Sequence, residues 1–276
     1  MTTDIDTRRL ATAVRRRMGL RARVVSRIQA IFDRLDFQVV RRGPVQRMTP
    51  ILPSPDEQVA LDRDLEAIHF DDQFEVFTSA DAVRTYLSPA RMSAQHHIIE
   101  LCHKFGVELK GKKVLEVGAG TGYLLRLLAA EVGDGGKAYG AEYFQELAYI
   151  AQGVAPDAEV VKAALIDLPA AGDRYDVVFC IEVLEHIIDT ETPIPTMLEL
   201  LNPGGAVVIT VPNVKFDNTP PLDTPDGNTY VGHVNCWTPQ SWEYYINRIA
   251  GAHSFEVGTI GHNYEGDNLY AVIRRD

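Results

Sequence analysis

The chain has 276 residues, 46% of them hydrophobic, and this length suits one large α/β domain with an extension. Its formal net charge of −11 is unevenly spread, because residues 1–47 hold 12 arginines and 4 aspartates while the remaining residues hold 15 basic and 34 acidic side chains. The acidic body disfavours duplex nucleic acid as a partner, since phosphate contacts need a basic face.

Residues 1–55 are predicted to form a basic helical extension followed by a linker. Apolar residues recur at helical spacing between Val24 and Leu35 with arginines among them, and prolines interrupt residues 49–55. Three roles stay open for the helix: packing on the domain or on the second subunit of a homodimer, peripheral contact with an anionic membrane surface, or a loose tail. RNA contact through Arg15–Arg17 is weakly supported, because no aromatic residues interleave there to stack bases.

Residues 56–110 are predicted to form a polar helical cap, and residues 111–276 a domain that opens with VLEVGAGTGY at 114–123. The first four residues of this stretch are typical of a buried parallel strand, and a helical pattern starts directly after the glycines. Glycines allow a bare backbone to approach a ligand at the carboxyl edge of a sheet. Tyr123 stands where a dinucleotide fingerprint has its third glycine, so a pyrophosphate ligand is disfavoured.

Two acidic residues narrow the choice of ligand. Glu116 lies in the strand just before the glycine loop, where it suits an amino group better than a phosphate. Glu142 ends the next apolar stretch, twenty residues after Gly122, where an acidic side chain can bind a ribose diol. Ribose recognition without a pyrophosphate site is the pattern of S-adenosylmethionine, which we therefore predict as the cofactor.

The rest of the domain alternates predicted strands and helices, as expected of a parallel sheet with right-handed crossovers. Leu201–Gly205 is predicted to be a turn before the fifth strand, and a helix is predicted after Pro239. The predicted strands lie near residues 112–117, 138–142, 159–163, 175–182, 206–212, 254–262 and 268–274.

Residues 213–237 form a long segment, rich in Pro, Asp, Asn and Thr, between the fifth strand and that helix. A loop of this length in a compact domain is usually functional or disordered, and this one leaves the carboxyl edge of the sheet. We predict an acceptor-side lid whose contacts are Tyr230, His233 and Trp237.

Together these motifs resemble class I S-adenosylmethionine-dependent methyltransferases over roughly residues 90–276. The sequence IEVLEH at 181–186 is similar to that of ubiquinone-biosynthesis O-methyltransferases and related small-molecule and sugar O-methyltransferases. The resemblance implies an α/β fold with a Rossmann-like, seven-stranded, mostly parallel sheet of order 3-2-1-4-5-7-6, its last strand antiparallel. It also implies that residues 56–110 close over the cofactor.

The resemblance further implies cofactor contacts. Family members often place an acid for the adenine near the end of the third strand, but here Ala164 occupies that position. Recognition is then left to backbone groups at Ala164 and Leu165, or to Asp167 if the register slips. Candidates for methionine-carboxylate or acceptor contacts are Tyr86, Arg91, His96 and His97, unless the two histidines are ordinary helix-surface residues. The predicted cofactor-binding residues are Glu116, Gly118, Ala119, Gly120, Gly122, Tyr123, Glu142, Tyr143, Ala164, Leu165 and Ile181.

Glu182, Glu185 and His186 follow the fourth strand, where the family places acceptor-side groups. If the segment is helical, their spacing puts all three on one face. Three interpretations stay open. His186 is a general base beside a carboxylate, or the three residues hold Mg²⁺ or another divalent cation that acidifies the acceptor, or Glu185 and His186 only cap the helix. His233 would complete either catalytic arrangement.

The leading hypothesis is an S-adenosylmethionine-dependent O-methyltransferase that acts on a hydroxyl of a small molecule or saccharide. A quinol or aromatic hydroxyl is the runner-up acceptor, and a non-catalytic S-adenosylmethionine-binding partner subunit is the alternative from another class. Nucleic-acid methylation is disfavoured, because no [DNS]-P-P-[YFW] motif follows the fourth strand.

Cysteine use and hydropathy predict a cytoplasmic protein. Cys102, Cys180 and Cys236 are odd in number and far apart, which disfavours a disulfide framework or a zinc site. No apolar run approaches the ~20 residues of a membrane span, and the segment after Arg8 and Arg9 lacks the apolar character of an export signal.

Overall fold

The computed structural model describes residues 51–68, 83–84, 86–215, 232–261 and 268–276. All of these belong to one compact unit, Gln46–Asp276. The basic helix predicted between Val24 and Leu35 lies outside the described residues, so the homodimer and membrane contacts predicted for it stay predictions. Among the helices of the described ranges, none combines the length and the apolarity that crossing a membrane requires.

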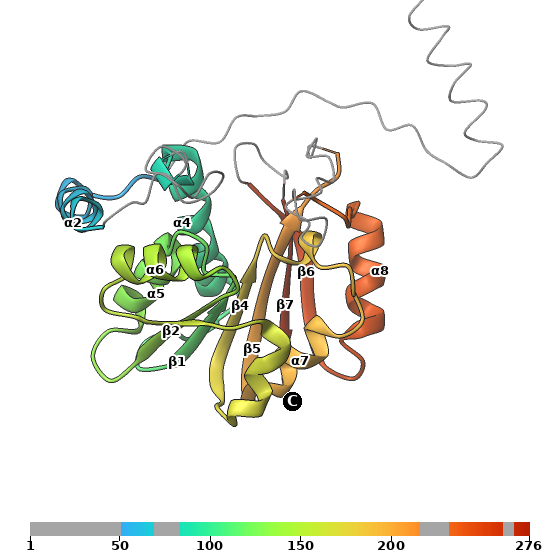
Figure 1. The fold of residues 1–276 in the computed structure, drawn as a ribbon. Coiled ribbons are helices and arrows are strands. Elements are labelled where there is room, and N and C mark those ends of the chain that lie inside the picture. The colour runs from blue at the N-terminus through green and yellow to red at the C-terminus, as the bar shows by residue number, and fades with distance from the viewer. Residues whose placement is uncertain (1–50, 69–82, 85, 216–231, 262–267) are drawn as a thin grey trace, which may run out of the picture. The chain divides into compact units, whose positions relative to one another are not determined.

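A seven-stranded sheet of order β3-β2-β1-β4-β5-β7-β6 forms the centre of this unit (Figure 1). Strands β1 to β5 pair in parallel, whereas β7 pairs antiparallel with β5 and with β6. The predicted strand order and the antiparallel last strand are therefore confirmed. The strands are β1 (Lys113–Val117), β2 (Lys137–Glu142), β3 (Glu159–Lys162), β4 (Tyr175–Ile181), β5 (Leu201–Pro212), β6 (Ser254–Ile260) and β7 (Asn268–Arg274).

Buried apolar side chains alternate between the two faces of the central strands. In β4, Val177 and Phe179 pack in one hydrophobic cluster, while Val178 and Cys180 pack in another. Strands buried on both faces appear in a sequence as continuous apolar runs, which is why the pattern located them. One face is covered by α4 (Pro89–Lys104), α5 (Tyr123–Val132) and α6 (Gln145–Val154), and the other by α7 (Pro193–Glu199) and α8 (Pro239–Ile249) (Figure 1).

The start of β5 corrects one predicted boundary. The predicted turn at Leu201–Gly205 belongs to the strand, because Leu201 pairs with Tyr175 before the register shifts. Gly204 has a φ of 76°, and its N–H donates to the carbonyl of Arg275. The left-handed Gly204 thus produces an irregularity inside β5. The Asn-Pro-Gly-Gly sequence had instead predicted a turn before the strand begins.

Helix α2 (Pro55–Glu66) packs on the side of the domain formed by α5 and α6. Leu61 belongs to a small hydrophobic cluster there and is 2% exposed. The guanidinium of Arg126 in α5 binds the carboxylate of Asp64 in α2 at 2.6 Å. The same nitrogen donates to the carbonyl of Val154, the last residue of α6, at 2.8 Å. One arginine therefore joins three helices.

Candidate active site

The glycine loop after β1 leaves a bare backbone beside open space. Gly118, Gly120 and Gly122 have φ values of 72°, 53° and 82°, in the left-handed region that favours glycine. A Cβ added at Gly122 would lie 2.7 Å from the backbone of Ala151 in α6, so this glycine serves packing. A Cβ added at Gly120 would meet nothing nearer than the Gly118 carbonyl oxygen, at 4.0 Å. The loop can therefore accept a ligand at Gly120.

Glu142, the last residue of β2, holds its carboxylate against this loop. One carboxylate oxygen accepts from the N–H of Gly120 at 2.9 Å and the other from the N–H of Phe144 at 2.9 Å. Burial raises the pKa of Glu142, and these backbone donors oppose the rise. The structure thus brings the predicted ribose-binding acid directly to the predicted glycine loop.

Glu116 is a buried carboxyl with unmet hydrogen-bonding capacity. It is 4% exposed, and its Oε2 has no hydrogen-bond partner among the residues that the structure describes. Burial raises its pKa well above the ordinary value, and the neighbouring charge of Glu142 adds to the rise. A buried acceptor of this kind is costly unless a donor reaches it. An ammonium group of a ligand has the chemistry to do so.

The expected adenine side of the site lies beyond Glu142. Tyr143 is 60% exposed, and Ala164 precedes the 3-10 helix η1 (Leu165–Ala171). The N–H of Ala163 donates to the Glu142 carbonyl at 3.0 Å, which places the end of β3 next to the ribose-binding acid. Leu165 is half-buried and packs against the core. Asp167, the alternative contact, is exposed in η1, so adenine recognition by Ala164 and Leu165 or by Asp167 stays a prediction.

Helix α4 contributes two histidines that are not ordinary surface residues. His96 Nε2 lies 3.1 Å from the hydroxyl of Tyr123, the first residue after the glycine loop. His97 is 6% exposed, and its Nδ1 has no hydrogen-bond partner within the described part of the chain. Burial lowers the pKa of His96, whereas it raises the pKa of Tyr123 to about 12. The guanidinium of Arg91 stacks over the ring of Tyr86, 4.5 Å from its centroid.

The segment after β4 departs from the predicted single helical face. Glu182 has a φ of 55°, and the short 3-10 helix η2 (Leu184–His186) begins only after it. The Glu182 carboxylate accepts from the hydroxyl of Thr210 in β5 at 2.8 Å. Ile181, the last residue of β4, is half-buried. Glu182 therefore does not share one helical face with Glu185 and His186, because its backbone is left-handed rather than helical.

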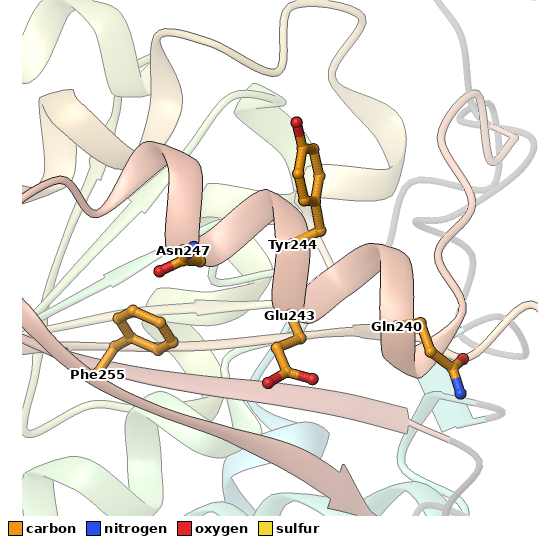
Figure 2. A pocket seen from close by; sticks show the side chains of 5 residues that line it. All are labelled: Gln240, Glu243, Tyr244, Asn247 and Phe255. Carbon is orange, nitrogen blue, oxygen red and sulfur yellow. The ribbon is translucent and has the colours of Figure 1, made fainter.

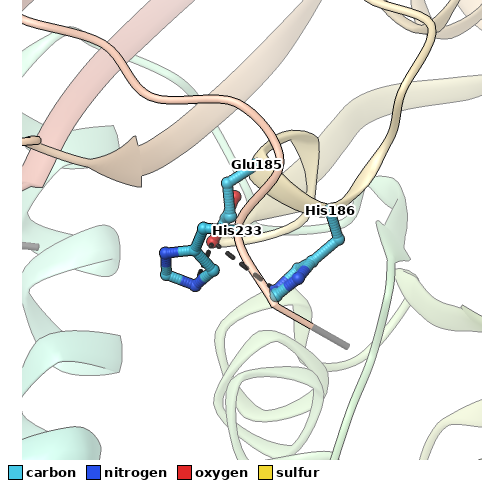
Figure 3. Close-up of side chains that lie close together, drawn as sticks. All are labelled: Glu185, His186 and His233. Carbon is cyan, nitrogen blue, oxygen red and sulfur yellow. Dashed lines mark ion pairs between the residues drawn. The ribbon is translucent and has the colours of Figure 1, made fainter. Parts of the chain in front are cut away.

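Glu185 forms a cluster with two imidazoles (Figure 3). The Glu185 carboxylate is 1% exposed, and its Oε1 lies 3.8 Å from His186 Nε2 and 4.0 Å from His233 Nε2. The two imidazole rings are 4.9 Å apart between centroids, in an edge-to-face arrangement. This Glu185–His186–His233 cluster contains two of the three predicted metal ligands, with His233 in place of Glu182.

The tautomer of His186 follows from its second nitrogen. Nδ1 lies 3.1 Å from the carbonyl oxygen of Gly232, and a carbonyl can only accept. The Nδ1 atom therefore carries a proton, which leaves the Nε2 lone pair of the neutral ring toward Glu185. Metal-binding and proton-accepting histidines are commonly oriented by such a contact.

Backbone hydrogen bonds bring His233 to the cluster. The N–H groups of Val234 and Asn235 both donate to the Glu185 carbonyl, at 2.8 and 3.0 Å. The side-chain amide of Asn235 also donates to the carbonyl of Ile187. The segment that carries His233 is thereby fixed to η2. Sequence reasoning had no way to foresee the orienting carbonyl of Gly232, since any residue supplies one.

Trp237 was predicted to contact the acceptor, and this prediction is wrong. Its side chain is 7% exposed and packs in the core, with ring centroids 5.4 Å from Trp242 and 5.8 Å from Tyr245. Trp237 therefore anchors the end of the predicted lid instead of facing an acceptor. Tyr230, the other predicted aromatic contact, lies outside the described residues.

A surface pocket on the outer side of α8 is separate from this site (Figure 2). It is lined by Gln240, Glu243, Tyr244, Asn247 and Phe255. None of these residues belongs to the predicted site, and Tyr244 points away from the others. The catalytic chemistry is therefore expected at the carboxyl edge of the sheet and not in this pocket.

Sequence reasoning missed Thr210, although a signal was present. Thr210 is the one polar residue in the run Ala206–Val211, which is otherwise apolar, and its side chain is 0% exposed. A hydroxyl buried in a strand needs a hydrogen-bond partner, and Glu182, which directly follows the neighbouring strand β4, could have been predicted as that partner.

Comparisons with known proteins agree with this geometry. A model of the methyltransferase domain matches residues 91–249. The ubiquinone biosynthesis O-methyltransferase of Pectobacterium atrosepticum is 39% identical over 110 residues, which cover 38% of this chain and 44% of that protein. The enzyme of the same name from Coxiella burnetii is 28% identical over 153 residues, covering 52% and 64%. The matches thus span about half the length of these curated relatives.

Solved structures share the fold. A SAM-dependent methyltransferase from Aquifex aeolicus matches with a TM-score of 0.54 and 16% identity, covering 71% of this chain and 98% of its own. A S-adenosylmethionine-dependent methyltransferase from Clostridium acetobutylicum matches with a TM-score of 0.51 and 13% identity, covering 71% and 95%. At these identities the likeness concerns the fold alone.

Proposed function

The chain belongs to the methyltransferase-domain family, and from that premise we propose that it transfers the methyl group of S-adenosylmethionine to a hydroxyl of a small molecule. The curated relatives reported above favour a quinol or another aromatic hydroxyl. The sequence favours a small molecule or saccharide ahead of a quinol or aromatic hydroxyl, but no comparison supports a saccharide acceptor. We therefore place the aromatic hydroxyl ahead of it.

The charge at the carboxyl edge supports a cationic cofactor. S-Adenosylmethionine carries a sulfonium and an ammonium group, and both are stabilised by nearby carboxylates. The thiol of Cys180 in β4 reports this field: burial raises its pKa, and the charges of Glu185, Glu182 and Glu116 raise it further. The carboxyl groups of Glu185, Glu182 and Glu116 therefore lie near one point at the end of β4, and a bound ammonium group would favour the ionised form of Glu116, whose pKa burial raises.

The observation that carries the proposed acceptor chemistry is the Glu185–His186–His233 cluster. An alcohol or phenol is activated as a nucleophile when a general base removes its proton. The acceptor oxygen attacks the methyl carbon, the carbon–sulfur bond breaks with its electron pair on sulfur, and the hydroxyl proton passes to His186 Nε2. Glu185, which is buried beside that ring, stabilises the imidazolium that forms.

The same cluster has the donors of a divalent metal site. One ligand atom from each residue lies within 4.8 Å of the others, and His186 is oriented by the Gly232 carbonyl as metal-binding histidines usually are. Two imidazoles with one carboxylate match zinc, manganese or iron better than Mg²⁺, which prefers oxygen ligands. A metal held by Glu185, His186 and His233 would supply acidification of the acceptor hydroxyl.

A methyl-transfer assay tests the proposal. The purified chain is incubated with S-adenosylmethionine and a panel of catechols, quinols, sugars and amines, with and without EDTA. We expect transfer to an aromatic hydroxyl. Transfer to amines alone would refute the acceptor class. Cofactor binding without turnover on any acceptor would favour the non-catalytic partner subunit instead.

A further inference from the structure

Thr210 is a buried polar residue between two core residues of β5. Its side chain is 0% exposed, as are those of Ile209 and Val211. Its hydroxyl donates to Glu182 Oε1 at 2.8 Å, and its carbonyl accepts from the N–H of Glu182 at 3.0 Å. A threonine in the interior of a sheet is costly unless its hydroxyl is satisfied, and here the hydroxyl and the carbonyl both bind Glu182.

That residue has a strained backbone. Glu182 is the one non-glycine residue with a positive φ in the described part of the chain, at 55°. A residue with a Cβ persists in this region only where the surrounding structure holds it, and such residues gather at functional sites. Thr210 supplies two of the contacts that hold it. A glycine would relieve the strain, so the presence of a glutamate requires a use for its carboxylate.

The location of Glu182 indicates that use. It follows β4 directly, and η2, which carries Glu185 and His186, begins two residues later. The strained carboxylate therefore lies on the same end of β4 as the Glu185–His186–His233 cluster.

We propose that Thr210 is a positioning residue for methyl transfer: it holds Glu182 in its left-handed conformation so that the Glu182 carboxylate stays at the acceptor side of the carboxyl edge. This proposal rests on the proposed function, since it assigns Glu182 to the acceptor rather than to the cofactor. A carboxylate held there orients the acceptor hydroxyl by accepting its hydrogen bond. The orientation of the carboxylate itself is determined by Thr210 of β5 and not by solvent.

The first test removes only the hydroxyl. Thr210→Val keeps the shape of the side chain, and we expect kcat to fall by roughly 10- to 100-fold, the scale of a lost hydrogen bond to a charged group. Affinity for S-adenosylhomocysteine should stay within about twofold, because the cofactor loop is on other strands. Thr210→Ser restores the hydroxyl and should recover most of the turnover. Thr196→Val is the matched control, since Thr196 is also buried but its hydroxyl donates to the carbonyl of Thr192, the residue before α7.

The second test asks whether Thr210 acts through Glu182. In a Glu182→Gln background, Thr210→Val should lower kcat by less than about threefold, because the charged acceptor of its hydrogen bond is already gone. Equal losses in both backgrounds would overturn the proposal, as would wild-type turnover in Thr210→Val.

The third test needs no turnover. Replacing Glu182 by glycine removes the strain but also the partner of Thr210, so its effect on the melting temperature should depend on residue 210. We expect the gain in Tm to be larger by roughly 3–6 °C in Thr210→Val than in the wild type. Equal gains would show that Thr210 does not hold Glu182 and would overturn the proposal. If the wild type methylates no acceptor while the gains differ, the proposed function fails and the structural assignment of Thr210 stands.

Discussion

The proposed cofactor half and the proposed acceptor half of the carboxyl edge are built in different ways. The cofactor half, at the ends of β1 and β2, uses the backbone of Gly118–Gly122 and the carboxylate of Glu142, which that backbone holds. The acceptor half, at the end of β4, uses side chains from two segments far apart in the sequence. The first half is complete once its strand, turn and helix form. The second requires residues 232–235 to dock on η2.

Gly120→Val separates the two halves most strongly. A Cβ at residue 120 would lie 4.0 Å from the nearest protein atom, the Gly118 carbonyl oxygen, and would occupy the space proposed for the ligand. We therefore expect the affinity for S-adenosylhomocysteine to fall at least about 100-fold. Gly135→Val is the matched control, because Gly135 has a φ of 87° and equally open surroundings away from the site. Calorimetry on both variants gives the comparison. Unchanged affinity in Gly120→Val would refute the cofactor site.

His186→Ala should damage only the acceptor half. We expect turnover to fall by about 10²- to 10⁴-fold, the usual contribution of a general base, with cofactor affinity unchanged. If the cluster holds a metal, EDTA should suppress turnover and an added divalent ion restore it. If His186 is a base alone, EDTA should have no effect and the rising limb of the pH–rate profile should vanish in the variant. His103→Ala, a change at an exposed histidine, is the control. Full activity without a chelator effect would leave only a structural role.

Glu142→Ala should weaken the cofactor half without destroying it. The loss of a hydrogen bond to a charged group corresponds to roughly 1.5–3 kcal/mol in binding free energy. The variant also releases the N–H groups of Gly120 and Phe144, which remain available to the ligand. Titration calorimetry with S-adenosylhomocysteine measures the change, with Glu159→Ala on the exposed start of β3 as the control. A decrease in kcat with unchanged cofactor affinity would contradict this assignment and would place Glu142 in the acceptor half.

Glu116→Gln should change how the stability of the cofactor half depends on pH. Burial holds the pKa of Glu116 well above its ordinary value in the folded protein. The folded chain therefore keeps a proton that the unfolded chain releases, and stability falls as pH rises from about 4.5 toward the folded pKa. Glutamine removes this loss, so the ligand-free variant should gain about 3–5 °C in Tm at pH 8 for each unit of pKa elevation. No gain at pH 8 relative to pH 4 would show that the carboxyl is not held protonated.

The difference between the two halves also explains which site residues could be predicted from the sequence. The positions of the glycine loop, Glu116 and Glu142 were predictable because spacing within one strand–helix–strand unit, β1–α5–β2, determines them. One helical face shared by Glu182, Glu185 and His186 was predicted from their spacing, and this face is not formed because Glu182 has a left-handed backbone. Strain at a single residue leaves no periodic signal.

Tertiary contacts account for the remaining differences. His233 could be named as a candidate but its approach to Glu185 depends on backbone hydrogen bonds from Val234 and Asn235. Trp237 is of a residue type that often contacts ligands, but here it packs in the core against Trp242 and Tyr245 of α8. Aromatic residues serve both purposes, and sequence alone does not distinguish them.

The arginine that joins α2, α5 and α6 has a consequence for hydrogen exchange. Arg126 lies one turn into the helix that begins at Tyr123, directly after the glycine loop. Opening of α2 breaks its contact with Asp64 and loosens the helix whose start borders the cofactor. Amides of α2 should therefore exchange as one cooperative unit with those of α5. Binding of the proposed cofactor at Gly120 should therefore slow exchange in α2 as well as in α5.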